Sequence, residues 1–78
     1  METAQSESVE RALWSALKAL EERVALLRKL ADQGRRRGHD AVASMFEERS
    51  RVVDNDVRAI HNLIVNSETL ETVGRENV

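Results

Sequence analysis

A repeating spacing of apolar residues constrains this chain more than any other feature of its sequence. From Val9 to Arg37, apolar side chains recur at alternating steps of four and three residues. The repeat consists of Leu13, Leu17, Leu20, Val24, Leu27 and Ala31. This spacing puts the side chains on one stripe of a helix, at the a and d positions of a heptad, and such a stripe packs against another helix. The pattern therefore predicts a long helix with a helical partner.

Further apolar residues widen this stripe. Val9, Ala16 and Leu30 flank it on the g side of the heptad, and Trp14 flanks it on the e side. A two-stranded coiled coil needs only the a and d residues, whereas a helix with two neighbours needs a broader apolar surface. The width of the stripe therefore indicates one helix of a four-helix bundle.

The segment between Gly34 and Asp40 reads as a helix–helix connection, and two end points for the first helix are open. Gly34 is one candidate for the left-handed residue that follows the helix. In the alternative, which we favour, the helix runs through Arg37, Gly38 takes the left-handed conformation and Asp40 caps the next helix. Basic residues in a last turn complement the negative end of the helix dipole, which supports this choice. Gly34 then lies inside the helix, where a small residue allows another helix to approach closely.

A second helix is predicted from about residue 41 to about residue 65. Its apolar stripe is again linked by steps of four and three residues and comprises Val42, Phe46, Arg49, Val53, Val57, Ile60 and Ile64. Arg49 falls on this stripe, where it is either buried and paired or extends its stem along the edge. Glu47 with Arg51, and Asp54 with Arg58, have the i, i+4 spacing of ion pairs on the outside of a helix.

These elements predict an all-α fold, an antiparallel helical hairpin that dimerises into a four-helix bundle. We expect a flexible lead over residues 1–8, capped into helix by Ser6 or Ser8, and the hairpin over 9–66. Helix 1 then spans about 7–37, the turn 38–40 and helix 2 about 41–65, followed by a polar tail over 67–78. The predicted oligomer interface comprises Leu13, Trp14, Leu17, Leu20, Val24, Leu27, Phe46, Val53, Val57, Ile60 and Ile64.

The composition favours helices and excludes several classes of site. The chain has no Pro, and the absence of Cys excludes disulfides and thiolate zinc sites. Its 12 basic and 14 acidic residues give a formal charge of −2, which argues against a nucleic-acid partner. No apolar run is long enough to cross a bilayer, and the acidic start is unlike a secretory signal. We therefore expect a cytoplasmic protein without a membrane partner.

Few residues are candidates for chemistry. Arg35, Arg36 and Arg37 form a basic cluster that could contact an anion or an acidic partner. A metal site in a helical bundle typically uses Glu-x-x-His, but Arg58 stands three residues before His61. We therefore predict no catalytic residue, no metal ligand and no cofactor. Two alternatives stay open: a ferritin-like metal-binding hairpin, and a nucleic-acid-associated protein that uses the arginine cluster.

Three segments resemble a known family. They are ALWSALKALEER at 12–23, RRRGH at 35–39 and FEER at 46–49. Together they look like the C-terminal helical extension of stand-alone chemotaxis-type protein-glutamate methylesterases. The resemblance implies a helical hairpin and, because this chain lacks the catalytic domain of that family, no catalytic residue. The predicted function is a small non-catalytic helical module for oligomerisation or protein interaction, with a regulatory role in bacterial signalling.

Overall fold

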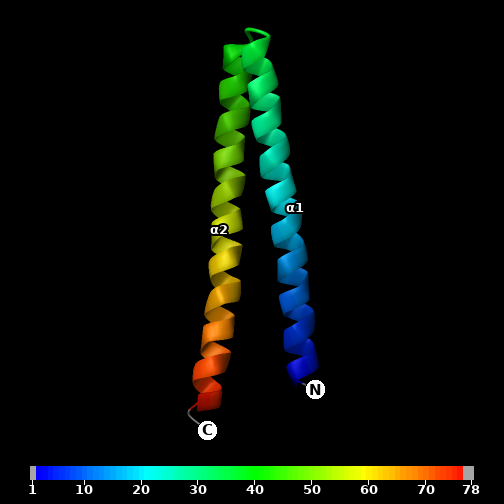
Figure 1. The fold of residues 1–78 in the computed structure, drawn as a ribbon, viewed down its shortest axis with the longest axis vertical. Coiled ribbons are helices and arrows are strands. Elements are labelled where there is room, and N and C mark those ends of the chain that lie inside the picture. The colour runs from blue at the N-terminus through cyan, green and yellow to red at the C-terminus, as the bar shows by residue number, and fades with distance from the viewer. Residues whose placement is uncertain (1, 77–78) are drawn as a thin grey trace.

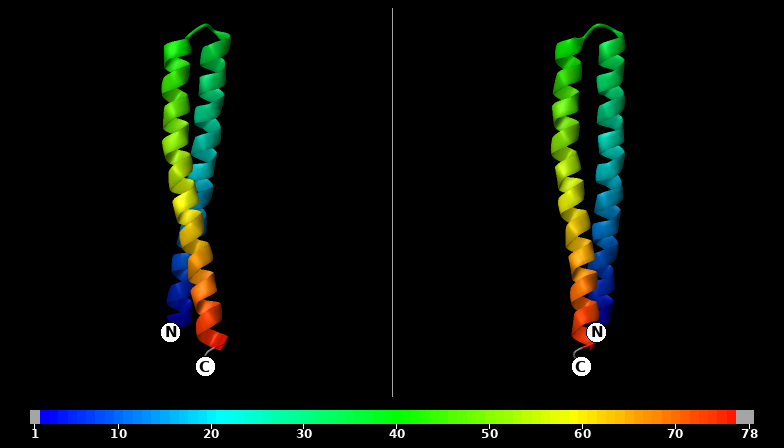
Figure 2. Two further views of the ribbon diagram at one scale, coloured as in Figure 1. Left: turned by 90° about the vertical axis from the view of Figure 1, so that its left-hand side faces the viewer. Right: turned by 60° about the vertical axis from the view of Figure 1, so that its left-hand side comes forward.

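The chain folds into two long helices joined by a tight turn. The computed structural model describes the backbone of residues 2–76 and the side chains of residues 7–66. α1 spans Glu2–Arg36 and α2 spans Asp40–Glu76, and the two run antiparallel, side by side (Figures 1 and 2). The hairpin measures 61 × 19 × 12 Å. The predicted all-α antiparallel hairpin is confirmed.

Both helices extend beyond the predicted boundaries at their outer ends, whereas α1 ends at Arg36, one residue before the predicted Arg37. α1 begins at Glu2, so residues 2–8 are not a separate lead and Ser8 lies within the helix rather than capping it. α2 continues to Glu76, so residues 67–76, which were predicted to follow helix 2, belong to it. The polar residues in both segments are weaker helix formers than Ala or Leu, but none is a proline that would stop a helix. Residues 1, 77 and 78 lie outside the described part of the chain.

The turn is built on a left-handed glycine. Gly38 has φ = 77°, as predicted for the residue that follows the first helix. The backbone N–H of Gly38 donates to the carbonyl of Arg35 over 3.0 Å, and that of His39 donates to the carbonyl of Gly34 over 2.7 Å. This pair of hydrogen bonds is the Schellman motif, which satisfies two carbonyls at the end of α1.

The start of α2 differs by one residue from the prediction. The carbonyl of His39 accepts the first helical hydrogen bond, from the backbone N–H of Ala43 over 2.9 Å. His39 is therefore the cap position, and Asp40 is the first residue of α2 rather than its cap. An acidic residue in the first turn still stabilises the helix, because it lies at the positive end of the dipole.

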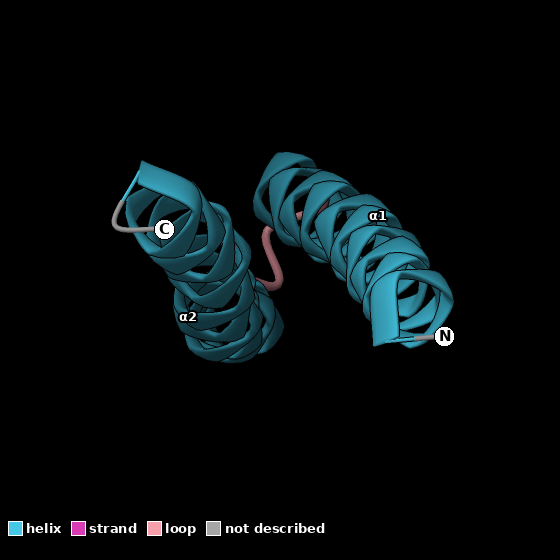
Figure 3. Ribbon diagram, turned by 90° about the horizontal axis from the view of Figure 1, so that it is seen from below, coloured by secondary structure: helices cyan, strands magenta, loops and turns pink. Residues whose placement is uncertain are grey.

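The two helices meet along a narrow apolar seam. The predicted stripe of α1 is confirmed, since most of its members are buried and Leu13 and Leu20 are half-buried. The buried apolar side chains on both helices are Leu17, Val24, Leu27, Ala31, Ala43 and Ile64. Figure 3 looks along the hairpin and shows a single layer of two helices. Both broad sides of the pair are therefore open.

The predicted stripe of α2 is wrong at two positions. Val42 and Arg49 are exposed, and the residues that follow them, Ala43 and Ser50, are buried in their place. The Ser50 hydroxyl donates to the backbone carbonyl of Glu47 over 2.7 Å, so its burial leaves no unsatisfied polar group. A buried arginine would need an opposite charge in the seam, whereas serine satisfies itself within its own helix.

Gly34 lets the helices approach closely at the turn, as the sequence predicted. A Cβ atom on Gly34 would lie 3.3 Å from the Cβ of Ala43, which is tighter than ordinary contact. Ala31 and Ala43, which are also small, are buried beside this contact. Figure 1 shows the ribbons closest together at the turn and further apart toward the termini. The small residues therefore set the spacing of the helices at one end.

Candidate functional site

One side of the seam carries charged and aromatic residues, and we call it the ion-pair edge. The Arg35 guanidinium forms an ion pair with the Glu47 carboxylate of the other helix. The rings of Trp14 and His61 meet edge to face, with centroids 6.4 Å apart and an interplanar angle of 79°. All four residues occupy the e position of their heptads, so this edge is where the e residues of the two helices face each other. Trp14 of α1 therefore lies opposite His61 of α2.

The opposite side of the seam carries the c and g positions of both helices and is mainly apolar. Six of the eight large apolar side chains that are strongly exposed lie at these positions, so they gather on one side instead of scattering. We call this surface the apolar face; its exposed members are Val9, Leu26, Val42, Met45, Val52 and Leu63. Arg23, Arg49 and Asp56 are the charged residues at these positions within the middle of the hairpin. Exposed apolar side chains gathered on one side in this way make the apolar face a candidate interaction surface.

The burial of the seam residues shows the same asymmetry. Nearly all a residues are buried, including Leu17 at 3% exposure and Ile64 at 1%. The d residues stand nearer the apolar face, and most of them are only half-buried: Leu13, Leu20, Phe46, Val53 and Ile60. The second helix therefore covers the a residues and leaves the d residues partly open toward the apolar face.

The predicted interface residues fall into three groups in the structure. Leu17, Val24, Leu27 and Ile64 are buried within one chain, so they contact the other helix of the same hairpin. Trp14 lies on the ion-pair edge. Leu13, Leu20, Phe46, Val53, Val57 and Ile60 are half-buried. Only the four buried residues are used fully within the hairpin, and the assignment of the other seven to an oligomer interface stays a prediction.

Sequence reasoning also missed most of the apolar face. Leu26, Met45, Val52 and Leu63 were not predicted as interface residues, yet each is between 44% and 56% exposed. They lie at the c and g positions, next to the d residues of the seam. The sequence could have revealed this face, because most residues at the c and g positions of each helix are apolar.

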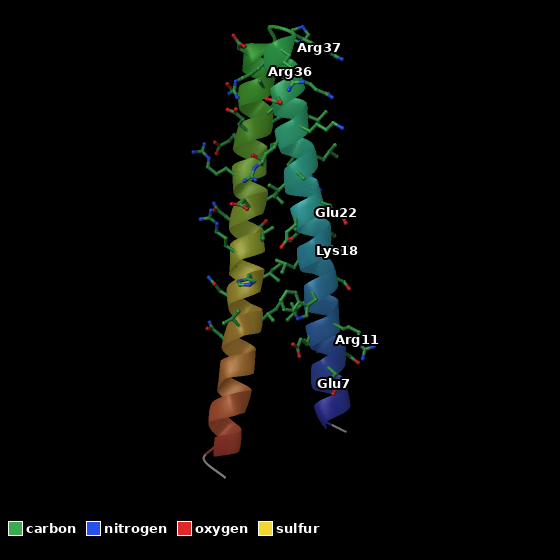
Figure 4. All side chains as sticks on the ribbon, in the orientation of Figure 1. Glu7, Arg11, Lys18, Glu22, Arg36 and Arg37 are labelled. Carbon is green, nitrogen blue, oxygen red and sulfur yellow. The ribbon has the colours of Figure 1, made fainter. Side chains whose placement is uncertain are left out.

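The arginine cluster is divided among different partners. Arg35 pairs with Glu47, and Arg36 pairs with Asp32 over 3.1 Å. The hydrogen bond from Arg35, together with its positive charge, lowers the pKa of Glu47. Arg37 has no ion pair with any described residue, and Figure 4 shows it with Arg36 at the turn. Because two of the three charges are neutralised, the structure does not bring the cluster together as an anion site.

Other charged residues cover the outside of the helices. Arg58 pairs with Asp54 over 3.2 Å, as predicted. The predicted pair of Glu47 with Arg51 is wrong, because Glu47 faces α1 across the seam and Arg51 pairs with Glu48 instead. On α1, Glu7, Arg11, Lys18 and Glu22 are exposed along the length of the helix (Figure 4). These residues provide a solvated surface rather than a site.

The described residues offer little for metal chemistry. Among residues 7–66, no three His, Asp or Glu side chains gather closely enough to hold a metal ion.

Neither helix, over its described length, is apolar enough to pass through a membrane. Comparison with family models, curated proteins and solved structures found no match. The likeness to the methylesterase extension therefore stays a prediction.

Proposed function

We propose that this chain is a non-catalytic self-association module, in which the apolar face of one hairpin packs on that of a second copy to form a four-helix bundle. The observation that carries the proposal is the gathering of six exposed large apolar residues on one side of the seam. Their burial would be favourable, at roughly 25 cal/mol per Å² of apolar surface removed from water. The half-buried d residues would become the centre of the bundle core.

The size of the surface supports this proposal. A chain of 78 residues has a small core of its own, and chains of this size commonly gain stability from a partner. From Val42 near the turn to the level of Val9, the apolar face spans about 26 residues of helix, or about 40 Å at 1.5 Å per residue. With a width of 19 Å, its footprint is about 750 Å² on each copy. That area is close to the roughly 800 Å² per partner of a stable interface.

Sedimentation of the wild type against Leu26→Glu tests the proposal. Leu26 is 55% exposed, so the charge leaves the seam of the hairpin intact while it disrupts the apolar face. We expect a dimeric wild type and a variant whose dimer dissociates at least about tenfold more readily. Ala25→Glu is the matched control, because it places the same charge on the outer side of α1. A wild type that is monomeric and fully helical at high concentration would contradict the proposal.

The biological setting of the module is proposed from the resemblance alone. Segments 12–23, 35–39 and 46–49 carry the likeness to the methylesterase extension, and this is the ground for a regulatory role in bacterial signalling. Under this proposal, the gene would lie near genes for chemoreceptors or response regulators. Inspection of the genomic neighbourhood tests that expectation.

A further inference from the structure

The apolar face contains a second seam on α2. The residues at its c and g positions recur at steps of three and four: Val42, Met45, Arg49, Val52, Asp56, Ala59 and Leu63. All seven are exposed in the single hairpin. This spacing is the same heptad signal that forms the internal seam, and such a stripe packs against a helix.

The g residues of this second seam are arranged so that the series, laid antiparallel to a copy of itself, pairs apolar with apolar and positive with negative residues. Val42, Arg49, Asp56 and Leu63 follow one another at intervals of seven residues. Read from either end, the series begins with an apolar residue and has opposite charges at its two middle positions. An antiparallel copy of α2 therefore places Arg49 opposite Asp56, and Val42 opposite Leu63. Arg49 and Asp56 form no ion pair with a described residue of their own chain.

We propose that two copies associate about a two-fold axis perpendicular to the helices, with α2 packed against α2 of the second copy and the two turns at opposite ends of the bundle. This proposal rests on the proposed function and specifies its geometry. The two-fold axis passes beside Val52, midway between Arg49 and Asp56, so that each dimer gains two Arg49–Asp56 pairs. Opposite charges that meet across an interface fix its register and exclude other arrangements.

The same two-fold axis fits α1. Gly34 lies level with Ala43, and because the helices are antiparallel, each earlier residue of α1 lies level with one later residue of α2. Val52 and Val53 are therefore level with Ala25 and Val24, and the axis crosses α1 between Val24 and Ala25. About that point, Ala19 stands opposite Leu30 of the second copy. A small residue opposite a large one allows two helices to interdigitate without a void.

The alternative arrangement places both turns at the same end and packs α2 against α1 of the second copy. At the register of the hairpin, that arrangement pairs Asp56 with Arg23 but sets Arg49 against Leu30. A charge facing an apolar residue loses hydration without gaining a partner. With the two turns at opposite ends, both charges on α2 gain an opposite charge, and Arg23 of α1 lies opposite Leu26 of the second copy. Each arrangement therefore leaves one arginine per chain unpaired, and exchange of the charges at residues 49 and 56 distinguishes them.

Charge exchange between residues 49 and 56 tests the arrangement. Arg49→Asp and Asp56→Arg each create two like-charged contacts per dimer, and we expect each to weaken association about tenfold or more. The double variant restores opposite charges and should return to within about threefold of the wild type. A mixture of the two single variants should form heterodimers in preference to either homodimer. Arg51→Asp, on the outer side of α2, is the matched control and should leave association unchanged.

Thiol crosslinking provides an independent readout, because the natural chain contains no Cys. Val52→Cys lies next to the axis and should give a covalent dimer with a short bis-maleimide. His39→Cys in the turn should not, because the two turns would be about 40 Å apart at 1.5 Å per residue. Two results would overturn only the arrangement with the turns at opposite ends. One is efficient crosslinking at residue 39; the other is a wild type that dimerises while the double charge variant does not regain association. A monomeric wild type overturns both this arrangement and the proposed function.

Discussion

The turn end and the open end of the hairpin hold their helices together in different ways. At the turn, Ala31, Gly34 and Ala43 bring the two backbones close, and the Arg35–Glu47 pair lies beside them. Toward the termini, large side chains such as Leu17 and Ile64 fill the seam, and the ribbons separate (Figure 1). The volume of the seam residues therefore sets the spacing of the helices along the hairpin.

This difference predicts where the free energy of unfolding is concentrated. Large buried side chains contribute more than small ones, because more apolar surface leaves the water. We therefore expect the open end to depend on its side chains and the turn end to depend on its backbone. Four variants test this comparison, in order of decreasing effect.

Leu17→Ala should have the largest effect. Leu17 is 3% exposed, and its truncation leaves a cavity in the seam, so the free energy of unfolding should fall by about 2–5 kcal/mol. Urea unfolding monitored by circular dichroism measures the change. Val65→Ala truncates an apolar side chain that is 43% exposed and lies outside the apolar face, and it should cost less than about 1 kcal/mol. Equal losses for the two variants would contradict the assignment of Leu17 to the seam.

Gly34→Val should have the next largest effect. Even a Cβ atom at this position would lie 3.3 Å from the Cβ of Ala43, so a branched side chain must push the helices apart. The expected loss is about 1–3 kcal/mol. Lys29→Val, on the outer side of α1, controls for the lower helix propensity of valine. A Gly34→Val variant as stable as this control would show that the close approach is unimportant.

Gly38→Ala should cost somewhat less, about 1–2 kcal/mol, because an alanine must adopt the left-handed conformation. A Cβ atom on Gly38 would meet nothing within 4 Å, so the cost comes from the backbone alone. Gly38→Asn should retain part of the lost stability, since asparagine tolerates this conformation better than alanine. An asparagine variant less stable than the alanine variant would argue against that origin.

Glu47→Gln should have the smallest effect and should change the pH dependence. Arg35 lowers the pKa of Glu47 in the folded chain, so the pair stabilises the fold above the ordinary pKa of a glutamate. That contribution is lost as the pH falls through the lowered pKa. Both side chains are about half exposed, which keeps the effect small. Thermal unfolding measured from acidic to neutral pH should show that the stability of the variant changes less steeply with pH on the acid side. An unchanged slope would show that the pair does not contribute to the pH dependence.

Much of the fold was predictable from local patterns. The stripe of α1, the left-handed Gly38 and the close approach at Gly34 were all predicted correctly, because spacing and glycine conformation are properties of short segments. The ends of the helices were not, because polar residues such as Asn66 and Ser67 are compatible with both a helix and a loop.

The register of α2 also escaped the sequence prediction. Val42 and Ala43 are both apolar, but only the stripe that begins at Ala43 alternates regularly between steps of three and four; the predicted stripe from Val42 has two consecutive steps of four. The structure selects Ala43 because a small residue is needed against Gly34, and this choice places Ser50 inside and Arg49 outside. The regular spacing of α2 therefore already indicated Ala43 and Ser50, and the contact with Gly34 gives the structural reason for this register.

The sequence by itself determined that this chain forms two long amphipathic helices joined at Gly38, because heptad spacing and glycine conformation act locally. The tertiary structure decided which apolar residues the hairpin uses internally and which it leaves exposed. It turned the a residues inward, left the d residues half-covered and gathered the c and g residues on one face. The physical reason is that two helices cover only one stripe of each other, and their relative rotation decides which stripe that is.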